Sequence, residues 1–257
     1  MTNRIDTLFL TKKSNILSIY FTAGYPNLTD TVPIIEALQA NGVDLIEIGM
    51  PFSDPLADGP VIQDSSTQAL QNGMSIPILF EQLKNIRKNV SIPLILMGYI
   101  NPIMQFGIEK FAKKASELGI DGIIVPDLPI KEYLNEFRAF FDAHNLRNIF
   151  LITPQTTEDR VRYIDDNSKG FIYMVSSSST TGTKDGTSDG QISYFERIES
   201  YNLENPRLIG FGIKDKQSFE KACKYGNGAI IGTAFVQQMS KNEPVESKVK
   251  SFIQALF

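Results

Sequence analysis

Two carboxylates near the start of the chain have a spacing and a setting that could do proton chemistry. Glu47 lies in the apolar run Val43–Ile48, and Asp58 follows in a loop rich in Pro and Gly, within the stretch IEIGMPFSDPLADGP. Removal from water makes a carboxyl group hold its proton more tightly, so Glu47 is a candidate general acid that can also act as a base. Asp58 lies between Ala57 and Gly59 on a polar turn, where a carboxylate stays ionised easily. Two acids whose surroundings push their proton affinities apart are typical of an acid/base pair.

Three glycine-bearing segments later in the chain could bind a phosphate group. They are TTGTKDG (Thr180–Gly186), GFGI (Gly210–Ile213) and IIGTAF (Ile230–Phe235), and each follows or ends a predicted strand. Glycine exposes backbone N–H groups, and the start of a helix adds a dipole that favours an anion. These segments therefore indicate a subsite for phosphate.

The chain has few residues that could support metal, thiol or histidine chemistry. One His (His144) and one Cys (Cys223) cannot form a His/Cys zinc cluster, so no metal site is predicted. His144 lies at the end of a helical segment, far from any nucleophile signature, and is interpreted as an ordinary helix-end residue. No lysine ends a predicted strand, so carbon–carbon cleavage would run through acid/base residues rather than a Schiff base.

Eight short apolar runs alternate with helical segments and would position these residues. Runs that are apolar throughout are typical of parallel strands covered on both faces. The predicted strands are Ile16–Thr22, Val43–Ile48, Ile92–Met97, Ile120–Val125, Arg147–Leu151, Phe171–Val175, Arg207–Gly210 and Ala229–Ile231. The predicted helices are Thr29–Ala40, Ile76–Lys88, Gly107–Leu118, Lys131–His144, Thr157–Asp166, Ser193–Glu199, Lys216–Lys224 and Val245–Leu256.

This alternation predicts an α/β fold, a (β/α)₈ TIM barrel formed by residues 1–257 as a single domain. Met1–Leu10 is predicted as an extra N-terminal helix that plugs the barrel floor. A doubly wound open sheet is the rival fold, but no GxGxxG follows the first strand. The stretch Ser176–Gln191 is the longest without element signals and is expected to be poorly ordered without ligand.

Composition excludes several classes of function. The chain has 257 residues, of which 42% are hydrophobic, and a net charge of −4 without a basic block, so nucleic-acid binding is not expected. No apolar run approaches the ~20 residues of a membrane span, and the N-terminus lacks the features of a signal peptide. A single Cys suits a reducing cytoplasm, which is the predicted location.

Six motifs occur in order along the chain, namely IEIGMPFSDPLADGPVIQ, LMGYINP, GIIVPDLP, TTGTKDG, GFGI and IIGTAF. Together they resemble the tryptophan synthase α-subunit family over nearly the whole chain. The resemblance implies a carbon–carbon lyase of tryptophan biosynthesis, which cleaves indole-3-glycerol phosphate to indole and glyceraldehyde 3-phosphate. It implies that Glu47 is the acid/base residue and that Asp58 binds the indole N–H and stabilises the protonated ring.

The resemblance also implies the remaining contacts. The implied substrate-binding residues are Tyr99, Tyr173, Thr181, Gly182, Phe211, Gly212, Gly232 and Thr233. Core packing at the strand ends is the alternative role for both tyrosines. Asp54 and Pro55 match a mobile loop that meets a β subunit, in an expected α2β2 heterotetramer. No cofactor is expected in this chain, because pyridoxal phosphate belongs to the β subunit.

Departures from the family pattern lie at three positions. Ser177 and Ser179 occupy places where members often carry Arg and Gly, and Pro126 stands where some have a small residue. Two alternatives stay open: another phosphate-binding barrel of the same pathway, and a non-catalytic barrel that only activates a partner. A synthase that closes the indole ring would need a lysine at a strand end, and a pseudo-enzyme would not need a buried acid.

Overall fold

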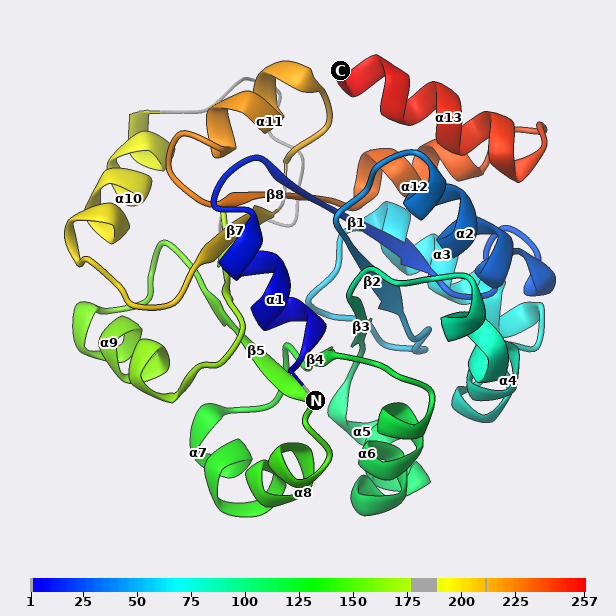
Figure 1. Ribbon diagram of the computed structural model, residues 1–257, viewed down its shortest axis with the longest axis horizontal. Coiled ribbons are helices and arrows are strands. Elements are labelled where there is room, and N and C mark those ends of the chain that lie inside the picture. Colours follow the sequence, from blue (N-terminus) through cyan, green and yellow to red (C-terminus); the bar gives the residue numbers. More distant parts are fainter. Residues whose placement is uncertain (1, 177–188, 211) are drawn as a thin grey trace.

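Eight parallel strands pair in chain order and close into a barrel (Figure 1). The computed structural model describes residues 2–176, 189–210 and 212–257. β8 pairs with β1, which completes the ring. The strands are β1 (Ile16–Thr22), β2 (Leu45–Gly49), β3 (Leu94–Met97), β4 (Gly122–Ile124), β5 (Arg147–Ile152), β6 (Ile172–Val175), β7 (Arg207–Gly210) and β8 (Gly228–Ile231). The predicted (β/α)₈ barrel is therefore confirmed.

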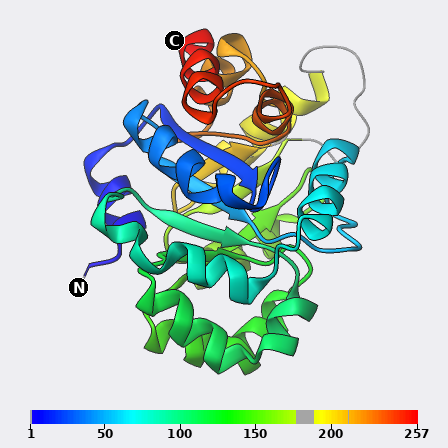
Figure 2. The same cartoon turned by 90° about the vertical axis from the view of Figure 1, so that its right-hand side faces the viewer.

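Helices surround the strands on the outside, as the two perpendicular views show (Figures 1 and 2). The α-helices are α1 (Arg4–Thr11), α2 (Thr31–Ala40), α3 (Pro60–Gln71), α4 (Ile76–Gln82), α5 (Ile100–Phe106), α6 (Ile108–Glu117), α7 (Ile130–Glu132), α8 (Arg138–Ala143), α9 (Glu158–Asn167), α10 (Asp189–Ser200), α11 (Lys216–Ala222), α12 (Thr233–Met239) and α13 (Val245–Leu256). Short 3₁₀ turns η1 (Leu28–Asp30) and η2 (Leu83–Lys88) precede α2 and follow α4, and a π-helical turn η3 (Tyr133–Phe137) joins α7 to α8.

Side chains of the strands divide between two hydrophobic cores. On β1, Leu17, Ile19 and Phe21 point outward and pack in the large core shared with the helices. The residues that alternate with them point into the barrel, where Tyr20 belongs to a smaller core inside the barrel. Ser18 lies on that same inner face and is fully buried. Polar groups on this inner face are therefore enclosed by strands on all sides.

The N-terminal helix α1 plugs the barrel floor, as the sequence predicts. Ile5 and Phe9 of α1 are buried and belong to the core inside the barrel. The ring of Phe9 lies 5.6 Å from that of Phe171, just before β6. Burial of two large apolar side chains ties this helix to the strands above it.

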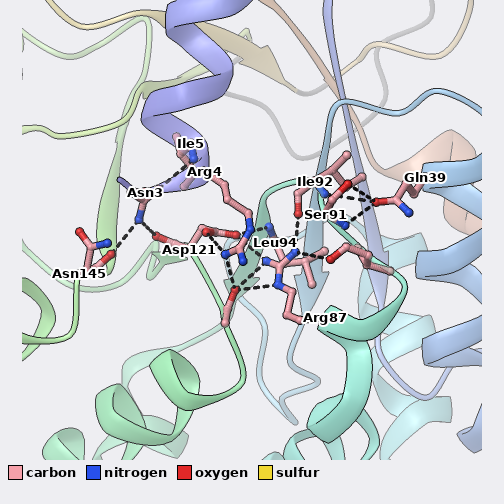
Figure 3. A network of polar contacts seen from close by, with 12 residues as sticks. Asn3, Arg4, Ile5, Gln39, Arg87, Ser91, Ile92, Leu94, Asp121 and Asn145 are labelled. Carbon is pink, nitrogen blue, oxygen red and sulfur yellow. Dashed lines mark hydrogen bonds and ion pairs between the residues drawn. The ribbon is translucent and has the colours of Figure 1, made fainter. Parts of the chain in front are cut away.

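A polar network fastens the same helix to the floor loops (Figure 3). The buried carboxylate of Asp121 accepts from Arg4 of α1 at 3.0 Å and from Arg87 at 2.6 Å. The side-chain amide of Asn3 donates to the backbone oxygens of Asp121 and Asn145, at 2.8 and 2.7 Å. The first helix is thus joined to segments that lie more than a hundred residues further along the chain.

The helix predictions differ from the structure in several places. α3 and α5 have no counterpart among the predicted helices. The sequence of α3, PVIQDSSTQALQ, is rich in polar residues of modest helix propensity. The predicted helix Lys131–His144 is interrupted by the π-helical turn, although His144 does end it as expected. The predicted start at Thr29 is wrong, because Thr29 lies within η1 and α2 begins two residues later.

Candidate active site

Glu47 of β2 points into the barrel and is completely buried. Ser18 of β1 donates a hydrogen bond of 2.8 Å to its Oε1. Within the described residues, Oε2 has no hydrogen-bond partner. Burial raises the pKa of Glu47 from 4.5 to about 8, and the bond from Ser18 lowers it in part. At neutral pH this carboxyl group therefore holds a proton that it can deliver.

Asp58 is buried as well, which corrects the expectation of a polar turn. Its exposed fraction is 6%, and burial raises its pKa, while a bond from Tyr99 lowers it. The hydroxyl of Tyr99 donates to Oδ2 of Asp58 at 2.7 Å and accepts from the backbone N–H of Ala57 at 3.0 Å. The loop after β2 folds over the barrel mouth and carries this carboxyl group inward.

The space beside Asp58 is small in this structure. The ring of Phe52, from the same loop, stacks on Tyr99 with centroids 5.1 Å apart and planes at 28°. The cavity has a volume of about 10 Å³ and is lined by Tyr20, Met50, Phe52, Pro55, Asp58, Ser66, Met97, Gly98, Tyr99 and Pro126. Pro126, one of the departures noted in the sequence, thus forms part of its wall. A cavity that holds one benzene ring has a volume of ~150 Å³, so this cavity by itself is too small for an aromatic ring.

Two buried tyrosines occupy equivalent places on β1 and β6, each against a glycine of the next strand in the sequence. The hydroxyl end of Tyr20 on β1 lies against Gly49, and that of Tyr173 on β6 lies against Gly210, so a Cβ at either glycine would overlap the tyrosine. Burial raises the pKa of both tyrosines. The negative charges of Glu47 and Asp58 add to both shifts, so the two carboxyl groups share one enclosure with these phenols.

The predicted phosphate residues lie at the ends of neighbouring strands. Gly212, two residues after β7, has φ +75°, a conformation that favours glycine. Gly232 follows β8 and is the N-cap of α12, whose first residue is Thr233. A Cβ at Gly232 would lie 3.4 Å from the ring of Tyr20. Thr181, Gly182 and Phe211, and most of the stretch Ser176–Gln191, lie outside the described residues.

The predicted partner-contact residues lie on the loop after β2. Asp54 is exposed, and Pro55 is buried beside the cavity. Between them and Asp58, the side chain of Leu56 is 86% exposed. This loop therefore presents one face to the carboxyl groups and the other to the surroundings.

Sequence reasoning missed three residues of this enclosure. Ser18 and Tyr20 are polar positions in the run ILSIYFT, and their period-two spacing was a signal that both face the barrel interior. Phe52 carried no such signal, because its stacking on Tyr99 depends on how the loop folds.

The fold and the enclosure define the class of (β/α)₈-barrel enzymes, here with a buried carboxyl group that faces the barrel interior. Among the described residues, no group of three or more His, Cys, Asp or Glu could hold a metal ion. A search of the same residues finds no helix with the length and apolarity that crossing a bilayer demands.

Comparison with known proteins agrees with this class. The sequence model of the family "Tryptophan synthase alpha chain" matches residues 8–256. The tryptophan synthase alpha chain of Flavobacterium johnsoniae is 59% identical over 98% of each chain, and that of Parabacteroides distasonis is 54% identical over 99% of each chain. The chain belongs to the tryptophan synthase alpha chain family.

Solved structures agree with this family assignment. A mutant tryptophan synthase alpha-subunit from Pyrococcus furiosus superposes with a TM-score of 0.87 at 34% identity, covering 95% of this chain and 98% of that one. Tryptophan synthase from M. tuberculosis in an aminoacrylate-bound form gives a TM-score of 0.86 at 26% identity, over 99% and 98% of the two chains. The barrel and its N-terminal helix are thus the fold of this family.

Proposed function

We propose that this chain cleaves indole-3-glycerol phosphate to indole and glyceraldehyde 3-phosphate, the α reaction of tryptophan synthase. Family membership supports this reaction, because the family match includes all eight strands, from β1 to β8. We take the barrel as a single domain. The observation that carries the proposal is the fully buried carboxyl group of Glu47, whose pKa burial raises to about 8. A group of this kind is protonated at neutral pH and can both give and take a proton.

The proposed reaction uses Glu47 twice. The protonated carboxyl group delivers its proton to C3 of the indole ring, which leaves a positive charge on the ring. The resulting carboxylate then removes the proton of the glycerol hydroxyl next to the scissile bond. As that oxygen forms the aldehyde, the electron pair of the carbon–carbon bond returns to the ring. Glu47 ends protonated, so no other proton source is needed.

Asp58 is the proposed partner of the indole N–H. A carboxylate aimed at the charged ring would stabilise the transition state more than the neutral substrate. Its Oδ2 is now bonded to Tyr99, so substrate binding would exchange one hydrogen bond for another. Tyr173 and, outside the described residues, Phe211 are the proposed neighbours of the ring.

The phosphate group is proposed to lie at the ends of β7 and β8. Gly212, Gly232 and Thr233 lie at neighbouring strand ends, and β7 pairs directly with β8. Backbone N–H groups at the start of α12 favour an anion. Thr181 and Gly182 complete the proposed set.

The proposed partner is a tryptophan synthase β subunit, in an α2β2 assembly, with pyridoxal phosphate held by that subunit. Asp54 and Leu56, exposed on the loop after β2, support a docking surface at the barrel mouth. Met104 of α5, after β3, is 56% exposed at the same end of the barrel. We also propose a cytoplasmic location, which the free Cys223 supports.

The test is direct. Indole-3-glycerol phosphate is added to the purified chain, with and without a β subunit, and indole is followed over time. Indole from the isolated chain, faster with the β subunit, is the expected result. Binding of the substrate without indole would favour the non-catalytic barrel, and a different product would favour another phosphate-binding barrel of the pathway.

A further inference from the structure

Ser18 is a hydroxyl group in the interior of the barrel that the proposed reaction has not yet used. Its exposed fraction is 0%, and it lies on the inward face of β1. Burial of a hydroxyl group is unfavourable unless it forms a hydrogen bond. The bond of 2.8 Å that Ser18 donates to Glu47 meets this requirement.

The strand register determines from which side Ser18 approaches Glu47. Tyr20 lies opposite Glu47 in the β1–β2 ladder, and Ser18 lies opposite Leu45. The serine is therefore one inward-facing position nearer the barrel floor than the carboxyl group. It bonds to Oε1 from the floor side of the barrel, away from the C-terminal ends of the strands, where a substrate would enter.

The two oxygens of Glu47 are not equivalent. Oε1 accepts the bond from Ser18, whereas Oε2 has no partner among the described residues. An oxygen that already accepts a hydrogen bond is the poorer place for the acidic proton, because that proton would compete with the donor. The proton of the neutral carboxyl group is therefore directed to Oε2.

We propose that Ser18 is a positioning residue, which fixes Oε1 of Glu47 and leaves the proton on Oε2 for transfer to the substrate. This inference rests on the proposed function. Ser18 itself touches neither substrate nor reacting atoms in the proposed reaction. Its effect passes through the orientation and acidity of the glutamic acid.

The surroundings of Glu47 leave Ser18 as the principal polar influence on it. The other described titratable groups that face it are Tyr20 on β1, Tyr173 on β6 and, further out, Asp58 in the loop after β2. Both tyrosines have raised pKa values and stay neutral, and β3, the other neighbour of β2, contributes only Leu94–Met97. Ser18 is the hydrogen-bond donor that lowers the pKa of Glu47.

Ser18→Ala tests the proposal through kcat, KM and the pH profile. We expect kcat for indole formation to fall about tenfold, with KM within about twofold, because orientation and acidity change but substrate contacts do not. The alkaline limb of the kcat profile should move to higher pH, because the carboxylate loses its donor. Ser18→Thr, which keeps a hydroxyl group, should return the limb to the wild-type position.

Ser65→Ala is the matched control. Ser65 is also a buried serine, bonded at 2.7 Å to the hydroxyl of Thr22 on β1, and it does not contact Glu47. The same oxygen atom is removed, so a general loss of stability would be similar. The control should leave the pH profile in place. If the alkaline limb of the kcat profile moved equally in Ser65→Ala, the specific role of Ser18 would be overturned.

A second measurement does not depend on turnover. Infrared difference spectra follow the protonated carboxyl band of Glu47 during a pH titration, and Glu47→Gln identifies the band by its loss. The band should persist to higher pH in Ser18→Ala than in the wild type. An unchanged midpoint would overturn the proposal, even if no indole were formed by any variant. Should Ser18→Ala not fold, Ser18→Cys, which has a weak donor and a similar volume, must show the same upward movement.

Discussion

The hydroxyl group of Tyr99 and the carboxyl group of Asp58 are joined by a hydrogen bond of 2.7 Å across the mouth of the barrel. The bond links the end of β3 to the loop after β2, and the ring of Phe52 stacks on the same tyrosine. These side chains fill most of the space next to the carboxyl group, where a cavity of about 10 Å³ remains. A ligand that bonds to Oδ2 of Asp58 would replace the bond from Tyr99.

Tyr99→Phe should bind an indole-containing phosphate ligand about threefold more tightly, because the ligand no longer has to break the bond to Asp58. The ring stays available for stacking. The free energy of unfolding should fall by about 1 kcal/mol through the same lost bond. Calorimetric titration and urea unfolding measure the two effects. Binding weakened tenfold would mean instead that the hydroxyl group contacts the ligand itself.

Glu47→Gln should reduce kcat for indole formation by about 10³-fold, because the amide can neither deliver nor remove a proton. The fold should persist, since the amide oxygen can still accept the bond from Ser18. Circular dichroism and indole release report the two properties separately. Turnover close to that of the wild type would remove Glu47 from the mechanism.

The stability of the protein should depend on pH through the same residue. The folded-state pKa of Glu47, about 8, lies above its ordinary value of 4.5, so the folded protein binds this proton more tightly. Its contribution to stability is full below pH 4.5 and is lost as pH rises to about 8. In urea unfolding, the free energy of unfolding of Glu47→Gln should therefore rise relative to that of the wild type between roughly pH 5 and pH 8. At higher pH the difference between the two proteins should stay constant. A constant difference across this range would contradict the raised pKa.

Leu56→Ser should weaken binding to a β subunit about tenfold, because a largely exposed leucine loses its apolar contact with the partner. The side chain of Leu56 is 86% exposed, so indole formation by the isolated chain should not change. Leu10→Ser on α1, at the barrel floor, removes a leucine that is 68% exposed and serves as the control. Equal effects of both substitutions on complex formation, measured by sedimentation, would exclude the proposed docking surface.

Asp121→Asn should lower the free energy of unfolding by about 3 kcal/mol, because it leaves the partly buried Arg87 without its anionic partner. The network lies at the barrel floor, because Asp121 immediately precedes β4, so kcat should stay near the wild-type value. Glu117→Gln, which breaks an exposed pair with Lys114, should change stability by less than about 0.5 kcal/mol. Similar losses in both variants would mean that burial does not strengthen the floor network.

The sequence predicts the barrel well, because its signal is repeated and local. The predicted bounds of β1 and β7 agree with the structure, and the predicted starts at Val43, Ile92 and Ile120 fall two residues early. Those apolar runs extend past the paired part of each strand. The N-terminal helix also follows from its own apolar residues, Ile5 and Phe9.

The site is predicted only in part, because its environment depends on contacts between distant segments. Burial of Glu47 follows from its own strand, and its position could be read from the motif. Burial of Asp58 could not, since it depends on the loop folding back so that Tyr99 reaches it from β3. The bond from Ser18 likewise depends on the register between β1 and β2, which no local pattern encodes.

The attachment of α1 has a consequence for the order of events during synthesis. Asn3 is bonded to backbone oxygens of Asp121 and Asn145, and Asp6 is paired with Arg147 at 2.6 Å. These partners leave the ribosome long after the helix itself. The first segment to be made must therefore wait for the middle of the polypeptide, and the floor of the barrel closes only once β5 has emerged.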